Sequence, residues 1–466
     1  MGGYGSTHVR ANTSIAQVRR WAASPAALWT AFVLVHGWVV VRSVRYLGSI
    51  FGDVDLYQWW ATQGMNSGWW PVLNFSWVYP AGALVPVTAP AFITHDRVGY
   101  RIVWVVMVTA LNAIAFAVLL HRRRWTGGEL AVEGDGEAGF NAVATCGEPV
   151  LDAHTTVNRD SAVNRNSAAA WWWLLFLAAL GPIWLGRLDG VIAPLMLVAL
   201  LEAQRRPALA TALATFGAWI KIAPAAVVVA MLASATQARA ALRKIVLPGA
   251  VVSVVVVGLA VAGGAGSRAW AVFGEQQARG LQAESVAATW FSVARLWNPS
   301  VSMKYNSEIF TFEVDGAGAA GVARALDVVL LGAMVAIALL TLFAARRANS
   351  VDVLLTSTFT MVVAMIVFNK VGSPQFQAWL GPCVAAGIAL ASAGTRKRWI
   401  VPGVLVMVAA VLTQVIYPMV YGPFLTGRTD MIVVGAARNL LMVALLGWGV
   451  WALVRLRGDA AGVSTE

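Results

Sequence analysis

Apolar segments recur along the whole of this 466-residue chain. Many of them approach the ~20 residues that a helix needs to cross ~30 Å of hydrocarbon. Hydrophobic residues make up 59% of the chain and charged residues only 12%, which is about half of the charged share of an ordinary soluble domain. The sequence therefore predicts an all-α polytopic membrane protein with one membrane domain, and the lipid bilayer as its solvent.

The basic residues between the apolar segments set the predicted topology. Lys and Arg gather in short clusters at 19–20, 122–124, 205–206, 239–244, 346–347, 396–398 and 455–457. The positive-inside rule places all of these clusters in the cytoplasm. Membrane orientation then explains the net charge of +12, and no nucleic-acid partner is needed.

One set of about 12 transmembrane helices satisfies every basic cluster. The predicted helices are 28–47, 99–121, 169–185, 190–203, 208–219, 222–235, 245–264, 323–345, 351–368, 376–392, 400–417 and 432–454. Parity requires the Pro-interrupted segment 79–94 to dip into the outer leaflet without spanning it. The pair of short segments within 208–235 can instead be a re-entrant hairpin, if protein surrounds it.

The membrane domain is predicted to cover residues 28–454, between cytoplasmic tails at 1–27 and 455–466. The polar segment 125–168 shows no helical or strand periodicity and predicts a disordered cytoplasmic insert. Two long loops, 48–98 and 265–322, face outward. Long loops over a membrane scaffold are where function concentrates, so we expect the functional site there.

The first outer loop carries Asp53, Asp55 and Tyr57. In an extended segment Asp53 and Asp55 share a side and can chelate a hard cation. In a helix Asp53 and Tyr57 share a face, and Asp53 is then a single carboxylate base. A third interpretation is an acidic pair that caps the helix carrying Trp59 and Trp60. The sequence assigns no metal site and no required cofactor, and a divalent cation stays an open alternative.

Four cations are predicted to lie at or near the outer membrane boundary: Arg187, Lys221, Arg279 and Lys370. Charges there are costly, which makes them functional candidates and, in this setting, ligands for a phosphate. The alternative for the two lysines is snorkelling to the headgroups. The alternative for Arg279 is a solvated interfacial helix with an Arg279–Glu284 contact.

Other polar residues converge on the same face and are candidates for contacts to a sugar or a lipid-linked donor. They are Tyr79, Asp189, Gln282, Glu284 and Gln375. The stretch from Gly316 to Gly321 matches GxGxxG, but a membrane span follows it and no acid lies ~20 residues further on, so a dinucleotide site is excluded. The chain lacks GxSxG, P-loop and HExxH motifs.

In these segments the chain resembles the actinobacterial GT-C glycosyltransferases, in particular family 87 and its polyprenyl-phosphate-mannose-dependent α-mannosyltransferases. The matching pieces are DVxLY at 53–57, YP at 79–80, GRLD at 186–189, KxxP at 221–224, RGLQAES at 279–285 and KVGSPQF at 370–376. GRLD departs from the family pattern, because it has Gly186 where relatives often carry an acid. The resemblance implies a GT-C-like bundle, a polyprenyl-phosphate sugar donor, an inverting transfer and Asp53 as the catalytic base.

The sequence thus predicts a multi-pass plasma-membrane glycosyltransferase whose active site faces the extracytoplasmic side. It would transfer a sugar, mannose by resemblance, from polyprenyl phosphate to a lipid-anchored glycan or polysaccharide of the cell envelope. Two alternatives stay open. One is a transporter or flippase of a lipid-linked sugar, because buried charges and broken helices also mark transport sites. The other is a GT-C enzyme that glycosylates protein.

Overall fold

The computed structural model describes residues 21–122 and 153–458. Within them, eight helical segments are long and apolar enough to cross a membrane. They are α2 (Pro25–Val44), α5 (Arg97–His121), the segment Asn164–Trp184 within α6 (Ala153–Leu180) and η3 (Gly181–Trp184), α10 to α11 (Ala238–Ala262), α14 (Ala319–Ala345), α15 (Ser350–Val367), η7 to η8 (Arg396–Met419) and most of α19 (Thr429–Gly458).

Four shorter apolar helices complete the bundle. They are α7 (Asp189–Glu202), α8 (Pro207–Ile220), α9 (Ala225–Ala233) and α16 (Leu380–Leu390). All twelve predicted segments are therefore helical, but these four are shorter than the length that crosses a bilayer without help. The described chain is largely helical, and its eight candidate spans indicate a multi-pass membrane protein.

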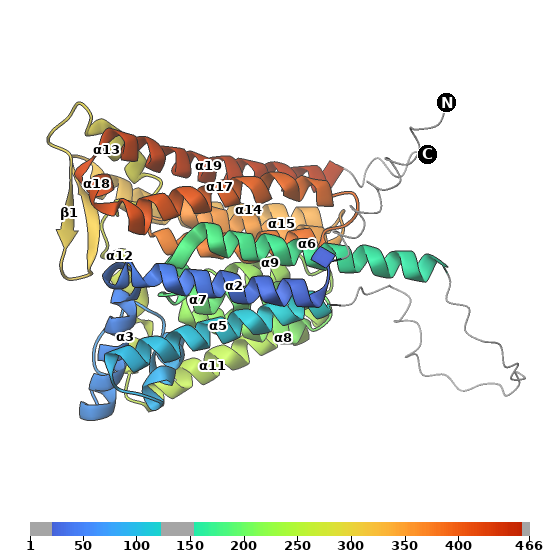
Figure 1. The fold of residues 1–466 in the computed structure, drawn as a ribbon, viewed down its shortest axis with the longest axis horizontal. Coiled ribbons are helices and arrows are strands. Elements are labelled where there is room, and N and C mark those ends of the chain that lie inside the picture. The colour runs from blue at the N-terminus through green and yellow to red at the C-terminus, as the bar shows by residue number, and fades with distance from the viewer. Residues whose placement is uncertain (1–20, 123–152, 459–466) are drawn as a thin grey trace, which may run out of the picture.

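The helices divide into a protein-packed core and a lipid-facing periphery. In α15, 89% of the most apolar window is buried, whereas in α10 to α11 only 11% is buried. Valines and leucines that α11 and α14 leave exposed would be unfavourable in water but suit contact with acyl chains. Figure 1 shows the spans running side by side, and α7, nearly all of whose residues are buried, lies inside the bundle.

The predicted outer loops hold ordered structure at one end of the bundle. The first contains α3 (Leu47–Ser67), η1 (Ala81–Ala83), α4 (Leu84–Thr88) and η2 (Ala89–Phe92). The second contains η5 (Gly266–Trp270), α12 (Ala271–Gln277), α13 (Ala288–Ala294) and an antiparallel hairpin of β1 (Ser302–Asn306) and β2 (Thr311–Asp315). The span Arg396–Met419 consists of η7 (Arg396–Trp399), α17 (Ile400–Gln414) and η8 (Val415–Met419). Two further short helices are η6 (Pro374–Trp379) and α18 (Tyr421–Thr426).

The hairpin is a small exception within the predicted all-α class. One predicted boundary was wrong. The disordered insert predicted for 125–168 is too long, because α6 begins at Ala153; the rest of that insert, and the tail 1–20, lie outside the described residues. The polar first turns of α6 continue an apolar helix, and a sequence window centred on them misses that continuity.

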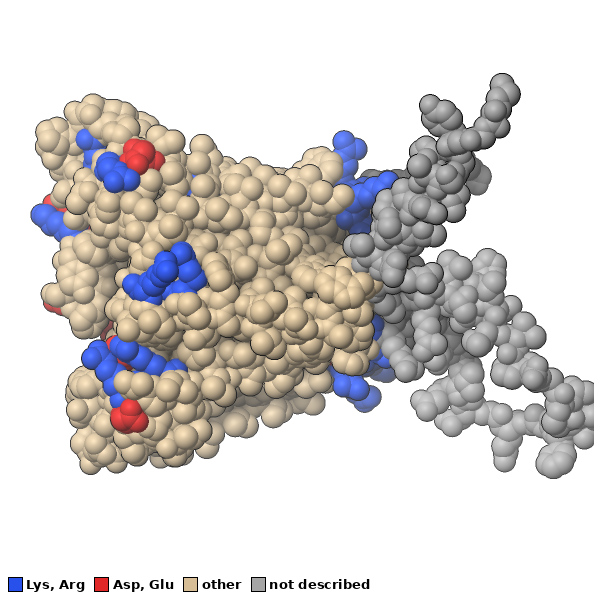
Figure 2. All heavy atoms as spheres, in the orientation of Figure 1, with Lys and Arg blue, Asp and Glu red and all other residues tan. Residues whose placement is uncertain are grey.

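The two ends of the bundle differ in the charged residues that they expose. Helix α3 lies across one end, close to the hairpin, whereas the described chain begins and ends near the other (Figure 1). In the view of Figure 2, Lys and Arg atoms gather at the second end, while both charge signs appear at the α3 end. We call these the basic end and the α3 end.

Candidate functional site

Helix α3 presents Asp53 at the α3 end of the bundle. The side chain of Asp53 is 34% exposed, and its Oδ2 lies 3.0 Å from Nε of Arg187. Because α3 is helical, Asp53 and Tyr57 share a face one turn apart, as the helical alternative predicted. Tyr57 is fully buried beneath the carboxylate. Asp53 is thus a partly accessible acid on a rigid element.

Arg187 fixes α3 against the buried turn between η3 and α7. Its guanidinium donates hydrogen bonds to the carbonyl oxygens of Ile50 at 2.6 Å and Ser49 at 2.9 Å, both in the first turn of α3. It also donates to the Tyr417 hydroxyl at 3.4 Å. Arg187, predicted as a phosphate ligand, is therefore committed to protein partners and orients Asp53.

Gly186 allows this close contact. A Cβ built at Gly186 would lie 2.0 Å from the Ile50 carbonyl oxygen. A larger side chain such as an acid cannot fit here without moving α3. Glycine at this position therefore has a steric reason in this chain.

Asp55 does not join Asp53. It points to a different face of α3, where Arg101 donates to both carboxylate oxygens at 2.6 and 2.5 Å and Arg97 donates at 2.6 Å. Burial alone would raise the pKa of the Asp55 carboxyl, but the hydrogen bonds from Arg101 and Arg97 outweigh it and lower that pKa. The interpretations of Asp53 and Asp55 as a metal-chelating pair and as an N-capping pair were both wrong, because α3 begins at Leu47 and both acids lie inside the helix.

Asp189 and Lys221 form a buried ion pair behind Asp53. Asp189 is 0% exposed, and its Oδ2 lies 2.6 Å from Nζ of Lys221. Its other oxygen accepts a hydrogen bond from Nε1 of Trp379 at 2.6 Å. Lys221 also lies over the ring of Phe376, 5.0 Å from the centroid. Snorkelling was the wrong alternative for Lys221, because the side chain turns inward to Asp189.

Tyr79 links the Asp53 and Asp189 groups. Its ring packs edge-on against Tyr57, with centroids 6.2 Å apart, and against Trp77 at 5.2 Å. Burial raises the pKa of the Tyr79 phenol, and the nearby carboxylates of Asp53 and Asp189 raise it further. Tyr79 is therefore a neutral hydrogen-bonding group between two acids at physiological pH.

The second outer loop brings Arg279 and Gln282 to the same end. Arg279 interacts electrostatically with Tyr79, and its buried Nε has no hydrogen-bond partner among the described residues. Gln282 is buried, and neither its Oε1 nor its Nε2 has a partner there either. Buried polar atoms without partners are rare in native structures, and a ligand is one explanation for them. The predicted interfacial helix at 279–285 is not present, because this segment forms turns.

Lys370 connects the segment 370–376 with the chain around the segment 279–285. Its Nζ lies 2.7 Å from Asp327 Oδ2 and 2.9 Å from the Gln277 carbonyl oxygen, while its own carbonyl accepts from the Gln282 amide at 2.9 Å. A Cβ at Gly372 would lie 2.0 Å from the Ser285 backbone nitrogen, so these segments touch. Lys370, like Lys221, is neutralised by a carboxylate.

Glu284 pairs with Arg438 of α19, not with Arg279. The Glu284 Oε2 and the Arg438 Nη1 are 2.9 Å apart, and each side chain is almost completely buried. Burial raises the pKa of the Glu284 carboxyl despite the nearby Arg438. Gln375, the remaining predicted residue, is half-buried in η6 next to this group of loops.

Sequence reasoning missed four residues of this network: Arg438, Tyr417, Tyr421 and Trp379. Arg438 had a signal, since an arginine several residues inside an apolar run is costly and marks a site. The other three had none, because tyrosine and tryptophan are also common at membrane boundaries. Tyr417 donates to the Ser49 carbonyl at 2.5 Å and so helps to hold α3.

Within residues 21–122 and 153–458, no group of three or more His, Cys, Asp and Glu side chains is placed to hold a metal ion. The chain matches no family model, no curated protein and no solved structure. The geometry of the α3 end is therefore the basis for a functional proposal.

Proposed function

We propose that this chain is a membrane glycosyltransferase of the GT-C type. It transfers a sugar, mannose as the first candidate, from a polyprenyl-phosphate donor to a glycolipid or polysaccharide acceptor of the cell envelope. The basic end faces the cytoplasm by the positive-inside rule, which puts the α3 end on the extracytoplasmic side of the plasma membrane. The motif resemblance and the multi-pass helical bundle support this proposal.

The environment of Asp53 carries the proposal. Among the acids of the described site, Asp189 and Glu284 are buried in ion pairs and Asp55 is held by two arginines. Of the four acids predicted for the site, Asp53 alone combines partial exposure with a single ion-pair partner. Asp327 is also exposed, but it was not one of these four and its carboxylate pairs with Lys370. A general base must reach a substrate proton, which the three other acids cannot do without breaking their contacts.

The proposed reaction is a single displacement at the anomeric carbon. The acceptor hydroxyl oxygen forms a bond to this carbon as its proton passes to Asp53. The bond between the anomeric carbon and the phosphate oxygen breaks, and the electron pair leaves with polyprenyl phosphate. The configuration inverts, and Arg187 holds the carboxylate in place through the 3.0 Å ion pair.

Arg279 is the best candidate for the donor phosphate. Lys221, Lys370 and Arg187 each have a carboxylate within 3.0 Å, whereas no such ion pair involves Arg279 among the described residues. Charge-assisted hydrogen bonds to phosphate are stronger than neutral ones, and guanidinium geometry suits them. The unpartnered amide of Gln282 and the phenol of Tyr79 are candidates for the sugar hydroxyls.

Paired substitutions test the proposal in reconstituted protein with labelled polyprenyl-phosphate mannose and envelope acceptors. Asp53→Asn lowers transfer by ~10² or more, because a positioned base contributes 10²- to 10⁴-fold. Arg279→Gln slows transfer by about 10- to 150-fold, whereas the exposed Arg428→Gln at the same end changes it by less than about 2-fold. Unchanged transfer in Asp53→Asn contradicts the base assignment.

One observation favours the alternative, a transporter of lipid-linked sugar. The chain breaks between α8 and α9 at Lys221 and Pro224, beside the buried Asp189. Discontinuous helices with charges at the break form substrate sites in transporters. In that case labelled lipid crosses the bilayer intact, Asp53→Asn impairs its crossing and no glycosidic product forms.

A further inference from the structure

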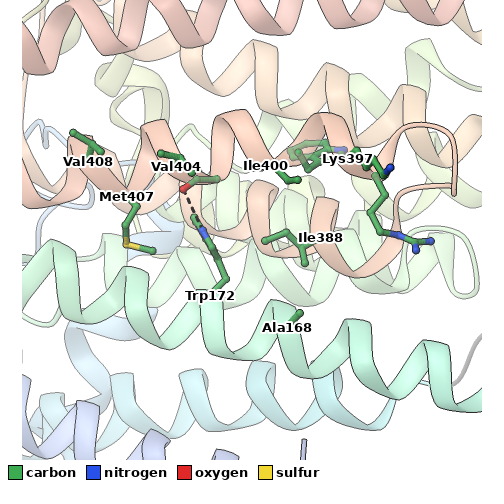
Figure 3. Close-up of a pocket in the computed structure, with 11 residues that line it drawn as sticks. Ala168, Trp172, Ile388, Lys397, Ile400, Val404, Met407 and Val408 are labelled. Atoms are coloured by element: carbon green, nitrogen blue, oxygen red, sulfur yellow. Dashed lines mark hydrogen bonds between the residues drawn. The ribbon is translucent and has the colours of Figure 1, made fainter. Parts of the chain in front are cut away.

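A cavity lined by residues of four helical elements lies away from the Asp53 site. It has a volume of about 580 Å³ and is lined by α6, α16, η7 and α17. Figure 3 shows Trp172 and Ile388 facing Val404 and Met407 across it, with Lys397 toward one end. Nearly all of its surface is carbon, apart from the basic side chains of Arg396 and Lys397. We call it the basic-end groove.

The groove has the length of one bilayer leaflet. Its lining runs from Arg396 to Val408 along a helical segment, which is roughly 18 Å at 1.5 Å per residue. One leaflet of hydrocarbon is about 15 Å thick. Ile400, Val404 and Val408 are exposed at its rim, so the groove opens sideways toward the bilayer and not only toward water.

Two cations stand where a lipid headgroup would lie. Arg396 and Lys397 begin a candidate membrane span, and neither has a carboxylate partner among the described residues. The Arg396 Nε is buried without a hydrogen-bond partner there. Asp352 forms no ion pair with either cation among the described residues; its Oδ1 accepts from the Ser392 amide at 3.0 Å and the Thr395 hydroxyl at 2.7 Å. The positive charges of Arg396 and Lys397 at this end of the groove therefore favour the binding of an anion.

We propose that the basic-end groove binds an anionic glycerophospholipid of the leaflet at the basic end. One acyl chain lies along Trp172, Val404 and Met407, and the phosphate contacts Arg396 and Lys397. Basic pockets between transmembrane helices bind anionic headgroups in this way. The site is at the opposite end from Asp53, so it is separate from the proposed transfer and does not depend on it.

Native mass spectrometry of delipidated protein tests this site with phosphatidylglycerol and phosphatidylcholine of the same acyl chains. The wild type retains phosphatidylglycerol preferentially. Arg396→Gln with Lys397→Gln weakens phosphatidylglycerol binding by roughly 30-fold, since each cation near the membrane surface contributes. The matched control is Arg346→Gln with Arg347→Gln, which removes two exposed charges from the same end outside the groove and leaves the preference intact.

A second variant tests the apolar part of the groove. Val404→Trp fills the lipid-facing side of the basic-end groove and lowers retention of both lipids, whatever their headgroup. Inorganic phosphate alone does not displace the lipid, because it has no acyl chain to occupy the groove. Equal retention of the two lipids by the wild type overturns the proposal. So does an equal loss in the Arg346 and Arg347 control, or complete displacement by inorganic phosphate.

Discussion

The contribution of the buried Asp189–Lys221 ion pair to the fold can be measured as a free energy of unfolding. Lys221→Met removes the ammonium and leaves the carboxylate of Asp189, 0% exposed, with Trp379 as its remaining partner. Removing one partner of a buried ion pair costs about 3–5 kcal/mol, because the other charge stays uncompensated. We therefore expect Lys221→Met to lower the free energy of unfolding by about that amount.

Lys370→Met is the matched control for this prediction. The substitution is identical and the ion-pair distance is similar, 2.7 Å against 2.6 Å, but the partner Asp327 is 44% exposed. The carboxylate of Asp327 is less buried than that of Asp189, so a smaller loss is expected, to which the hydrogen bond to the Gln277 carbonyl also contributes. The expected cost is about 1–2 kcal/mol.

The assay is reversible denaturation of purified protein in mixed micelles, followed by tryptophan fluorescence. The double variant Asp189→Leu with Lys221→Met removes both charges and should recover most of the lost stability, because replacing a buried pair by apolar groups is often neutral. Equal losses in Lys221→Met and Lys370→Met would refute the reasoning. Wild-type stability in Lys221→Met would likewise show that burial of this pair does not stabilise the fold.

Three further predictions follow from the same contacts. Gly186→Ala places a methyl 2.0 Å from the Ile50 carbonyl and should cost about 1–3 kcal/mol of stability, measured by the same denaturation. The lowered pKa of Asp55 means that its contacts with the arginines stabilise the fold at neutral pH and lose this effect as the pH falls through that pKa. The difference in unfolding free energy between wild type and Asp55→Asn should therefore narrow on acidification from about pH 5 to 3. A constant difference contradicts this prediction. In a cysteine-free background, an impermeant thiol reagent added outside should label Ser267→Cys and not Ala393→Cys, and the reverse pattern inverts the topology.

Hydropathy predicted the membrane helices because burial in lipid dominates their energetics. Every predicted apolar segment is helical, and most of its boundaries lie within a few residues of those observed. Helix α3 was considered only as an alternative for Asp53 and as a helix carrying Trp59 and Trp60, because it lies across the end of the bundle and mixes Trp, Gln and Gly in a pattern that does not require a span. Of the β-hairpin, the sequence indicates only the strand-like stretch from Glu308 to Val314, ahead of the GxGxxG match, since the partner strand Ser302–Asn306 has little apolar alternation.

Motif order predicted which segments meet, but not which side chains pair. Topology alone brings the two outer loops and the turn at 186–189 to one end, and the structure shows their contacts. The partners of Glu284 and Asp189 lie 154 and 190 residues away along the chain. Single-sequence patterns carry no information on such distant pairs, so Arg279–Glu284 was proposed from proximity in sequence and was wrong.

The fate of a labelled donor tests the central claim most directly. Purified protein in vesicles is given polyprenyl-phosphate mannose labelled in the sugar, together with a delipidated envelope acceptor extract. The proposed enzyme moves the label into a new glycosidic product and releases polyprenyl phosphate, and the Asp53→Asn protein forms at least ~10² less of it. Label that stays on its original lipid and only changes sides of the bilayer would contradict the account and identify a transporter.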